Sequence, residues 1–134
     1  MTAGRRAAEG ATTAFALWAP VAAYIAIIFT LSSGPSLPLP RLTTDKMAHA
    51  GVYAGLAFLL ARAFAGGFPR RITPRTALLA VAVTIAYGVS DEWHQLFVPG
   101  RTADRADVLA DAIGALVGTS VCWAWGTIRL RPDV

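Results

Sequence analysis

Long apolar runs alternate with short polar segments along almost the whole chain. The runs cover approximately residues 14–31, 43–64, 74–97 and 105–128, and prolines, glycines and arginines gather in the breaks between them. Each run is close to the roughly 20 residues that a helix needs to cross the hydrocarbon core of a bilayer. The pattern predicts an all-α fold: an integral membrane four-helix bundle over residues 14–128, with tails at residues 1–13 and 129–134.

Residues that favour helix starts stand directly before three of the runs. The expected N-caps are Thr43, Thr44 or Asp45 for the second helix, Thr73 for the third and Asp104 for the fourth. Pro74 suits the first position of the third helix, and Asp107 follows Asp104 with the spacing of a capping box. Residues 1–12 are short and polar, and we expect them to form a disordered tail at the membrane surface.

Composition supports a membrane protein and excludes several other classes. The chain is 55% hydrophobic with a mean hydropathy of +0.52, above the roughly 45–50% apolar content of soluble domains. Eleven of its twelve basic residues are arginines scattered over loops and tails, so no basic helix face is available for nucleic acid. Cys122 is the only cysteine, which excludes an intrachain disulfide and a cysteine-based metal site.

The basic residues predict how the helices are oriented. Eight lie at the end that holds both termini and the second loop: Arg5, Arg6, Arg62, Arg70, Arg71, Arg75, Arg129 and Arg131. Four lie at the other end: Arg41, Lys46, Arg101 and Arg105. Because basic residues are enriched in cytoplasmic loops, we expect both termini in the cytoplasm and a multi-pass protein of the cytoplasmic (inner) membrane.

The last two turns of the third run hold acidic residues in an unfavourable place. Asp91 and Glu92 lie near the C-terminal end of the expected helix, where the helix dipole disfavours negative charge. At about 1.5 Å per residue, Asp91 is on the order of 9 Å below Phe97, so its charge needs a partner at that depth. The expected partners are Arg101, Lys46 and Arg105, and the expected neighbours on the same helix are Tyr87, His94 and Gln95.

Two further polar stripes lead to the same end of the bundle. Asp45, His49 and Tyr53 share one face of the second helix, with Lys46 beside them. Asp45 could instead serve only as a cap and Lys46 could extend to the lipid headgroups, but His49 lies a turn deeper. On the fourth helix, Asp107 and Asp111 share a stripe with Gly114 and Gly118, which allow helices to approach closely.

These stripes predict a polar pocket of carboxylates, imidazoles and cations facing away from the cytoplasm. Carboxylates with histidine could hold a hard or borderline divalent metal, although no short ligand motif is present. Alternatively, Lys46, Arg101 and Arg105 could clamp the phosphate of a lipid headgroup, which guanidinium groups bind well.

The arrangement of these residues resembles the VanZ-like family. The resemblance is carried by four motifs: Ser32-Ser33-x-Pro35, Asp45-Lys46-x-x-His49-x-x-x-Tyr53, Asp91-Glu92-x-His94-Gln95-x-Phe97-x-Pro99-Gly100-Arg101, and Asp107-x-x-x-Asp111-x-x-Gly114-x-x-x-Gly118. It covers about residues 24–120, with two departures: Asp111 in place of an asparagine and Gly34 in place of a common glutamine. The resemblance implies a small membrane protein of a family named after a protein linked to low-level teicoplanin resistance.

Three functions follow as hypotheses. The first is binding or processing of an anionic cell-envelope lipid, such as one linked to polyprenyl phosphate, with an effect on glycopeptide susceptibility. As an enzyme, the protein would use His49 or His94 as general acid or base, oriented by Asp91 or Glu92. The second is an accessory protein in which the same residues form a closed ion-pair network. A transporter comes third, because four short helices leave little room for a path unless the chain forms a homo-oligomer.

Overall fold

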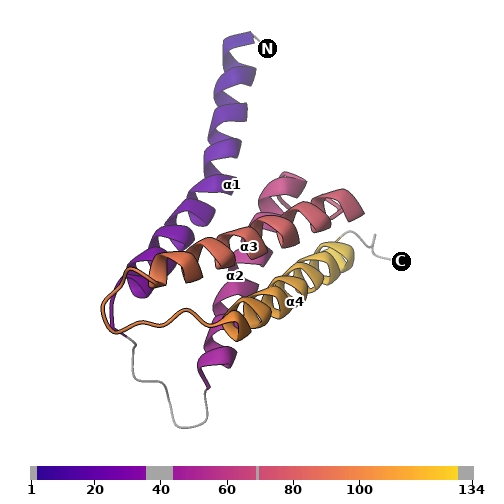
Figure 1. Cartoon of the computed structure of the whole chain (residues 1–134). Helices are drawn as coiled ribbons and strands as arrows, with labels where there is room; N and C mark the ends of the chain where they lie inside the picture. The colour runs from indigo at the N-terminus through magenta and orange to yellow at the C-terminus, as the bar shows by residue number, and fades with distance from the viewer. Residues whose placement is uncertain (1–2, 36–43, 69, 130–134) are drawn as a thin grey trace.

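The computed structural model describes residues 3–35, 44–68 and 70–129, with side chains described from Thr13 to Ile128. It contains four helices: α1 (Ala3–Ser32), α2 (Asp45–Ala65), α3 (Pro74–Gln95) and α4 (Arg105–Arg129), and no strand within those residues (Figure 1). The predicted all-α four-helix architecture is therefore confirmed.

Local capping residues set the starts of α2 and α3, as the sequence predicts. The Thr44 hydroxyl accepts a hydrogen bond from the Met47 amide at 3.2 Å and begins α2. Thr73 and Thr76 form a capping box before α3, with Pro74 at its first position. These threonines satisfy amides that the first helical turn leaves free.

The first helix differs from the prediction. It begins at Ala3, so the backbone of residues 3–12 is helical and does not form a disordered tail. The physical reason is that these residues are rich in alanine and arginine, and adding turns to an existing helix avoids the cost of nucleation. In Figure 1 this N-terminal part of α1 projects beyond the other three helices.

Helices α2 and α4 form the most extensive contact in the molecule, and α2 also packs against α1 and α3. Glycines allow this close approach: a Cβ atom on Gly114 would lie 2.2 Å from the Ala50 carbonyl oxygen, and one on Gly118 would lie 1.9 Å from that of Ala54. The predicted inward-facing glycine stripe of α4 is confirmed.

The distribution of polar and apolar side chains is that of a membrane protein. Three helices in the described part of the chain are long and apolar enough to cross a membrane, over Thr13–Ser32, Asp45–Ala65 and Arg105–Ile128. Helix α3 is not among them because Asp91, Glu92 and Gln95 lower its average, yet these three side chains are buried. Its outward face exposes large hydrophobic side chains: Leu78, Leu79, Val83, Val89 and Trp93.

Candidate functional site

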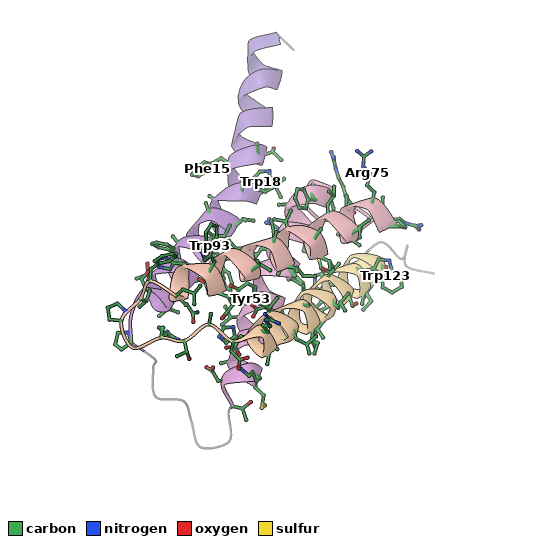
Figure 2. All side chains as sticks on the ribbon, in the orientation of Figure 1. Phe15, Trp18, Tyr53, Arg75, Trp93 and Trp123 are labelled. Carbon is green, nitrogen blue, oxygen red and sulfur yellow. The ribbon has the colours of Figure 1, made fainter. Side chains whose placement is uncertain are left out.

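The polar side chains of the bundle gather at one end, where the C-termini of α1 and α3 meet the N-termini of α2 and α4. Figure 2 shows nitrogen- and oxygen-bearing side chains clustered around the start of α4 and the first turns of α2. Hydrogen bonds join all four helices there, and they divide into three groups, centred on Asp91, His49 and Lys46.

Asp91 is buried and holds two neutral hydrogen-bond partners. The Ser32 hydroxyl donates to its Oδ1 at 2.6 Å, and the Gln95 amide donates to its Oδ2 at 3.3 Å. Among the described residues no ion pair joins Asp91 to Arg101, Lys46 or Arg105, so the predicted charged partners are wrong. The reason is geometric: α1 ends beside Asp91, and the hydroxyl of Ser32, the last residue of α1, is close enough to donate a hydrogen bond to it.

His49 is oriented by Asp111. Its Nδ1 lies 3.0 Å from Asp111 Oδ1, and its Nε2 lies 3.9 Å from Asp107 Oδ2. Asp111 is fully buried, and Gly88 of α3 leaves room for it, since a Cβ there would lie 2.7 Å from Asp111 Oδ2. The orienting carboxylate of His49 is therefore Asp111, in place of the predicted Asp91 or Glu92.

Lys46 joins α2 to the start of α4 through two carboxylates. Its Nζ donates to Asp104 Oδ2 at 2.6 Å and also to Asp107 Oδ1. The hydrogen bond from Lys46 is the main reason that the pKa of Asp104 lies below its ordinary value, with a smaller contribution from the Ala106 amide. Lys46 is thus already neutralised by this protein's own acids.

Glu92 completes the cap of α4 from a neighbouring helix. Asp104 Oδ1 accepts from the Ala106 amide at 2.9 Å, as expected of an N-cap. The Asp104 amide, however, donates to Glu92 Oε2 at 2.8 Å, whereas the predicted capping box assigns that role to Asp107. The Asp107 carboxylate is taken by Lys46, so a residue of α3 replaces it.

Arg101 binds the end of α1. Its Nε donates to the Gly34 carbonyl at 3.0 Å, and its Nη2 donates to the Leu31 carbonyl at 3.1 Å. The Leu31 carbonyl belongs to the last turn of α1, where a helix leaves its carbonyl oxygens free, and Gly34 follows that turn. Arg101 therefore ties the α3–α4 loop to α1, while Arg105 is exposed on α4 and lines neither of the cavities described next.

Two cavities open at this end and share part of their walls. The larger, of about 240 Å³, is lined by Ile28, Leu31, Ser32, Asp45, Ala48, His49, Val52, Tyr53, Asp91, Gln95 and Arg101. The smaller, of about 130 Å³, is lined by Asp45, Lys46, Gln95, Gly100, Arg101, Thr102, Asp104 and Asp107. The two cavities adjoin, because both are lined by Asp45, Gln95 and Arg101. The larger one is partly apolar and the smaller one is polar.

His94 and Tyr87 lie outside these cavities. His94 Nε2 lies 3.0 Å from the Ser33 hydroxyl, and its ring stacks on Phe29 with centroids 4.8 Å apart. The Tyr87 hydroxyl donates to the Ile25 carbonyl at 3.2 Å. Of the two predicted acid–base histidines, the structure therefore brings only His49 to a cavity, and His94 and Tyr87 hold α3 against α1.

Several buried polar atoms have no hydrogen-bond partner in the described part of the chain, and two of them matter for the site. Glu92 Oε1 is one, although Oε2 of the same carboxylate is bonded. The other is the hydroxyl of Tyr53, which lies near Asp91 without a hydrogen bond of normal geometry to it. Asp45, His49 and Asp107 additionally offer ligand atoms that all lie within 4.8 Å of one another, which is a grouping able to hold a metal ion.

Sequence reasoning missed three contributors to the site. Ser32 contacts Asp91 and Ser33 contacts His94, but the sequence pattern predicts no role in the site for either serine. Asp104 contacts Lys46, whereas the sequence predicts only a helix cap at this position. A signal was present for the serines, because two hydroxyls stand at the end of a long apolar run. Arg41 and Ser36 lie outside the described residues.

Comparison with known proteins gives a family. The family model described as VanZ/LLP1 matches residues 9–126, nearly the whole chain. The chain belongs to the VanZ/LLP1 family. Searches of curated proteins and of solved structures found no match. All the site residues described above lie within the part that matches the VanZ/LLP1 model.

Proposed function

We propose that this VanZ/LLP1 protein binds an anionic lipid of the cell envelope at the polar end of its bundle. The supporting observation is that a partly apolar cavity adjoins a polar one through Arg101, Asp45 and Gln95. A ligand that fills both needs an apolar part next to a polar head, which is the chemistry of a lipid at its headgroup.

The surface of α1 continues the apolar side of this arrangement. A shallow hollow of about 250 Å³ is lined by Ala26, Ile27, Thr30 and Leu31. Leu31 also lines the larger cavity, so the two hollows flank one side chain on the lipid-facing edge of α1. An acyl or polyprenyl chain could follow this edge while its head enters between the helices.

The charge preference rests mainly on Arg101. Of the three cations predicted to clamp a phosphate, Lys46 is held by Asp104 and Asp107, and Arg105 lines neither cavity. Arg101 lines both cavities and uses Nε and Nη2 on carbonyl oxygens, so Nη1 is the guanidinium nitrogen that donates to no described residue. A phosphate oxygen suits this donor because charge-assisted bonds are stronger than neutral ones.

The cellular setting and the chemistry complete the proposal. We place the protein in the cytoplasmic membrane as a multi-pass protein whose site faces away from the cytoplasm, which is where polyprenyl-phosphate-linked intermediates are used. If the protein processes its lipid, His49 is the acid–base group, because Asp111 fixes its ring in a cavity wall. A change in glycopeptide susceptibility would then follow from altered handling of that lipid.

Native mass spectrometry of the purified protein tests lipid binding. Phosphatidylglycerol and phosphatidylcholine are added separately to wild type, Arg101→Gln and Arg105→Gln. Losing one charge-assisted hydrogen bond costs about 1.5–3 kcal/mol, so Arg101→Gln should bind phosphatidylglycerol roughly 10- to 100-fold more weakly. Arg105→Gln, the matched control, should bind like wild type. Equal retention of both lipids, or equal effects of both substitutions, would overturn the proposal.

A structural role in an accessory protein is the second candidate, and the polar contacts themselves favour it. Lys46, Glu92 and Asp104 join α2, α3 and α4 without any ligand. In that case Lys46→Met should lower the melting temperature in detergent, while wild type binds neither lipid. If the wild type binds lipid, the hydrogen bonds of Lys46, Glu92 and Asp104 would serve to support the lipid site.

A further inference from the structure

We infer that Asp45, His49 and Asp107 form a binding site for a first-row divalent metal ion, with Zn²⁺ or Mn²⁺ as the expected class. The inference does not rest on the lipid proposal, because a metal would bind these residues whether or not a lipid is present. It rests on the geometry of the three ligands, on the group that orients the histidine, and on an unpaired buried hydroxyl in the cavity wall beside two of them.

The three ligands converge at the place where the two cavities adjoin. One donor atom from each lies within 4.8 Å of the others, and His49 Nε2 is 3.9 Å from Asp107 Oδ2. Two ligands at about 2.0–2.2 Å from one metal stand up to roughly 4 Å apart, so the histidine–Asp107 separation already fits. Asp45 is exposed and can rotate the short remaining distance.

The histidine is prepared as a ligand. Its Nδ1 lies 3.0 Å from Asp111 Oδ1; with the ring proton on Nδ1, this N–H donates a hydrogen bond to Asp111, and Nε2 keeps its lone pair on the side of Asp107. Histidines that ligate metals characteristically donate their other ring nitrogen to a carboxylate. The Tyr53 ring lies parallel to that of His49, with ring centroids 6.3 Å apart.

Both oxygens of Asp107 have a use in this arrangement. Lys46 binds Oδ1, and Oδ2 is the oxygen that faces His49. Lys46 has Asp104 as its second partner, so it can remain in place when Oδ2 binds a metal. The Asp107 carboxylate would then bind two cations, the Lys46 ammonium through Oδ1 and the metal ion through Oδ2.

An unpaired buried hydroxyl lies in the wall of the cavity beside two of the ligands. Tyr53 is only 1% exposed, its hydroxyl has no partner among the described residues, and Tyr53 lines the larger cavity with Asp45 and His49. Leaving such a group unsatisfied is costly. A water ligand on a metal ion held by Asp45 and His49 would offer this hydroxyl a hydrogen-bond partner.

The ligand set selects the class of metal. One imidazole nitrogen with carboxylate oxygens suits borderline first-row ions better than Ca²⁺ or Mg²⁺, which take oxygen ligands. Three protein ligands also leave a coordination position open. Since Asp45 lines both cavities, that position faces space that a water or a ligand head can occupy.

Equilibrium dialysis with elemental analysis tests the site. The full chain, carrying Cys122→Ser and no histidine tag, is stripped with chelator in detergent and titrated with Zn²⁺ alone. We expect saturation at one ion per chain in wild type and in His94→Gln, and loss of saturable binding in His49→Gln. Asp111→Asn should weaken binding about 10- to 100-fold, the usual effect of changing a group that orients a ligand.

Asp45→Asn provides a second test, because Asp45 is exposed and its substitution is the least able to disturb folding. It should lower Zn²⁺ affinity even if His49→Gln elutes as misfolded protein. The absence of saturable binding in wild type would overturn the inference, as would equal loss in His94→Gln. Unchanged binding in Asp45→Asn and Asp107→Asn would do the same.

Discussion

Ser32 and Asp91 form a buried hydrogen bond between α1 and α3. Both are buried, and the 2.6 Å hydrogen bond between them joins residues 59 positions apart. A carboxylate away from water is costly unless its oxygens are bonded, and here one neutral hydroxyl and one neutral amide supply those bonds. Asp91 is therefore one of the polar side chains that fix the end of α1 to the bundle, together with His94 and Arg101.

Ser32→Ala should destabilise the protein by about 1–3 kcal/mol, because it leaves a buried carboxylate oxygen without a donor. Thermal unfolding in detergent measures the loss, and Ser33→Ala is the matched control. The Ser33 hydroxyl is exposed, so water replaces its contact with His94 and the cost should stay below about 1 kcal/mol. Equal melting temperatures for the two variants would contradict a special role for Ser32.

The Lys46–Asp104 pair predicts a pH dependence. Because Lys46 lowers the folded-state pKa of Asp104, this carboxylate stabilises the fold above its ordinary pKa of about 4, and that contribution is lost as the pH falls through the lowered value. Asp104→Asn keeps an N-capping side chain but removes the charge. Its melting temperature should therefore fall less than that of wild type between about pH 6 and pH 3; parallel curves would refute the pairing.

At the residue scale, the sequence predicted which polar side chains are buried but not their partners. The stripe of Asp45, His49 and Tyr53 and the depth of Asp91 follow from helical spacing, and the structure brings these residues to one cavity. The partners are 58 to 62 residues away in the cases of Lys46, Asp91 and His49. Such pairs depend on how helices rotate against each other, which spacing within one helix does not encode.

At the scale of the elements, the contact between α2 and α4 gives a sharp prediction. Gly118→Ala places a methyl group where the Ala54 carbonyl oxygen lies only 1.9 Å away, so the backbones must separate. Overpacking of this kind typically costs about 1–3 kcal/mol. Gly126→Ala on the same helix is the control, since its nearest neighbour is 3.7 Å away and alanine favours a helix.

Detergent melting curves of the two glycine variants measure the difference. Gly118→Ala should melt well below wild type, and Gly126→Ala should melt at or above it.

Helix boundaries such as Thr44 and Thr73 could be predicted because capping is local. The glycine spacing predicts that α4 approaches the bundle closely, but not that α2 is the helix it meets. The replacement of Asp107 by Glu92 in the cap of α4 could not be predicted, because it joins two helices.

At the scale of the whole molecule, the chain places its polar groups inside and large hydrophobic groups outside. Asp91, Glu92, Asp107 and Asp111 are each at most 6% exposed, whereas Phe15 is 76% exposed. In water this would be an unstable arrangement, because a large contiguous apolar surface would remain hydrated. In a bilayer it is favourable, since lipid solvates the exterior and the acids find partners within the bundle.

The orientation of the bundle remains a prediction from charge. Eight basic residues are assigned to the side of the termini and four to the other side, which predicts cytoplasmic termini because positive loops are retained there. In a Cys122→Ser background, Ala3→Cys and Pro132→Cys should resist a membrane-impermeant thiol reagent in intact cells, and Ser36→Cys should react. Permeabilised cells are the control, since all three positions should then be labelled. Labelling of Ala3→Cys in intact cells with protection of Ser36→Cys would place the polar site, and with it the proposed metal and lipid, on the cytoplasmic face.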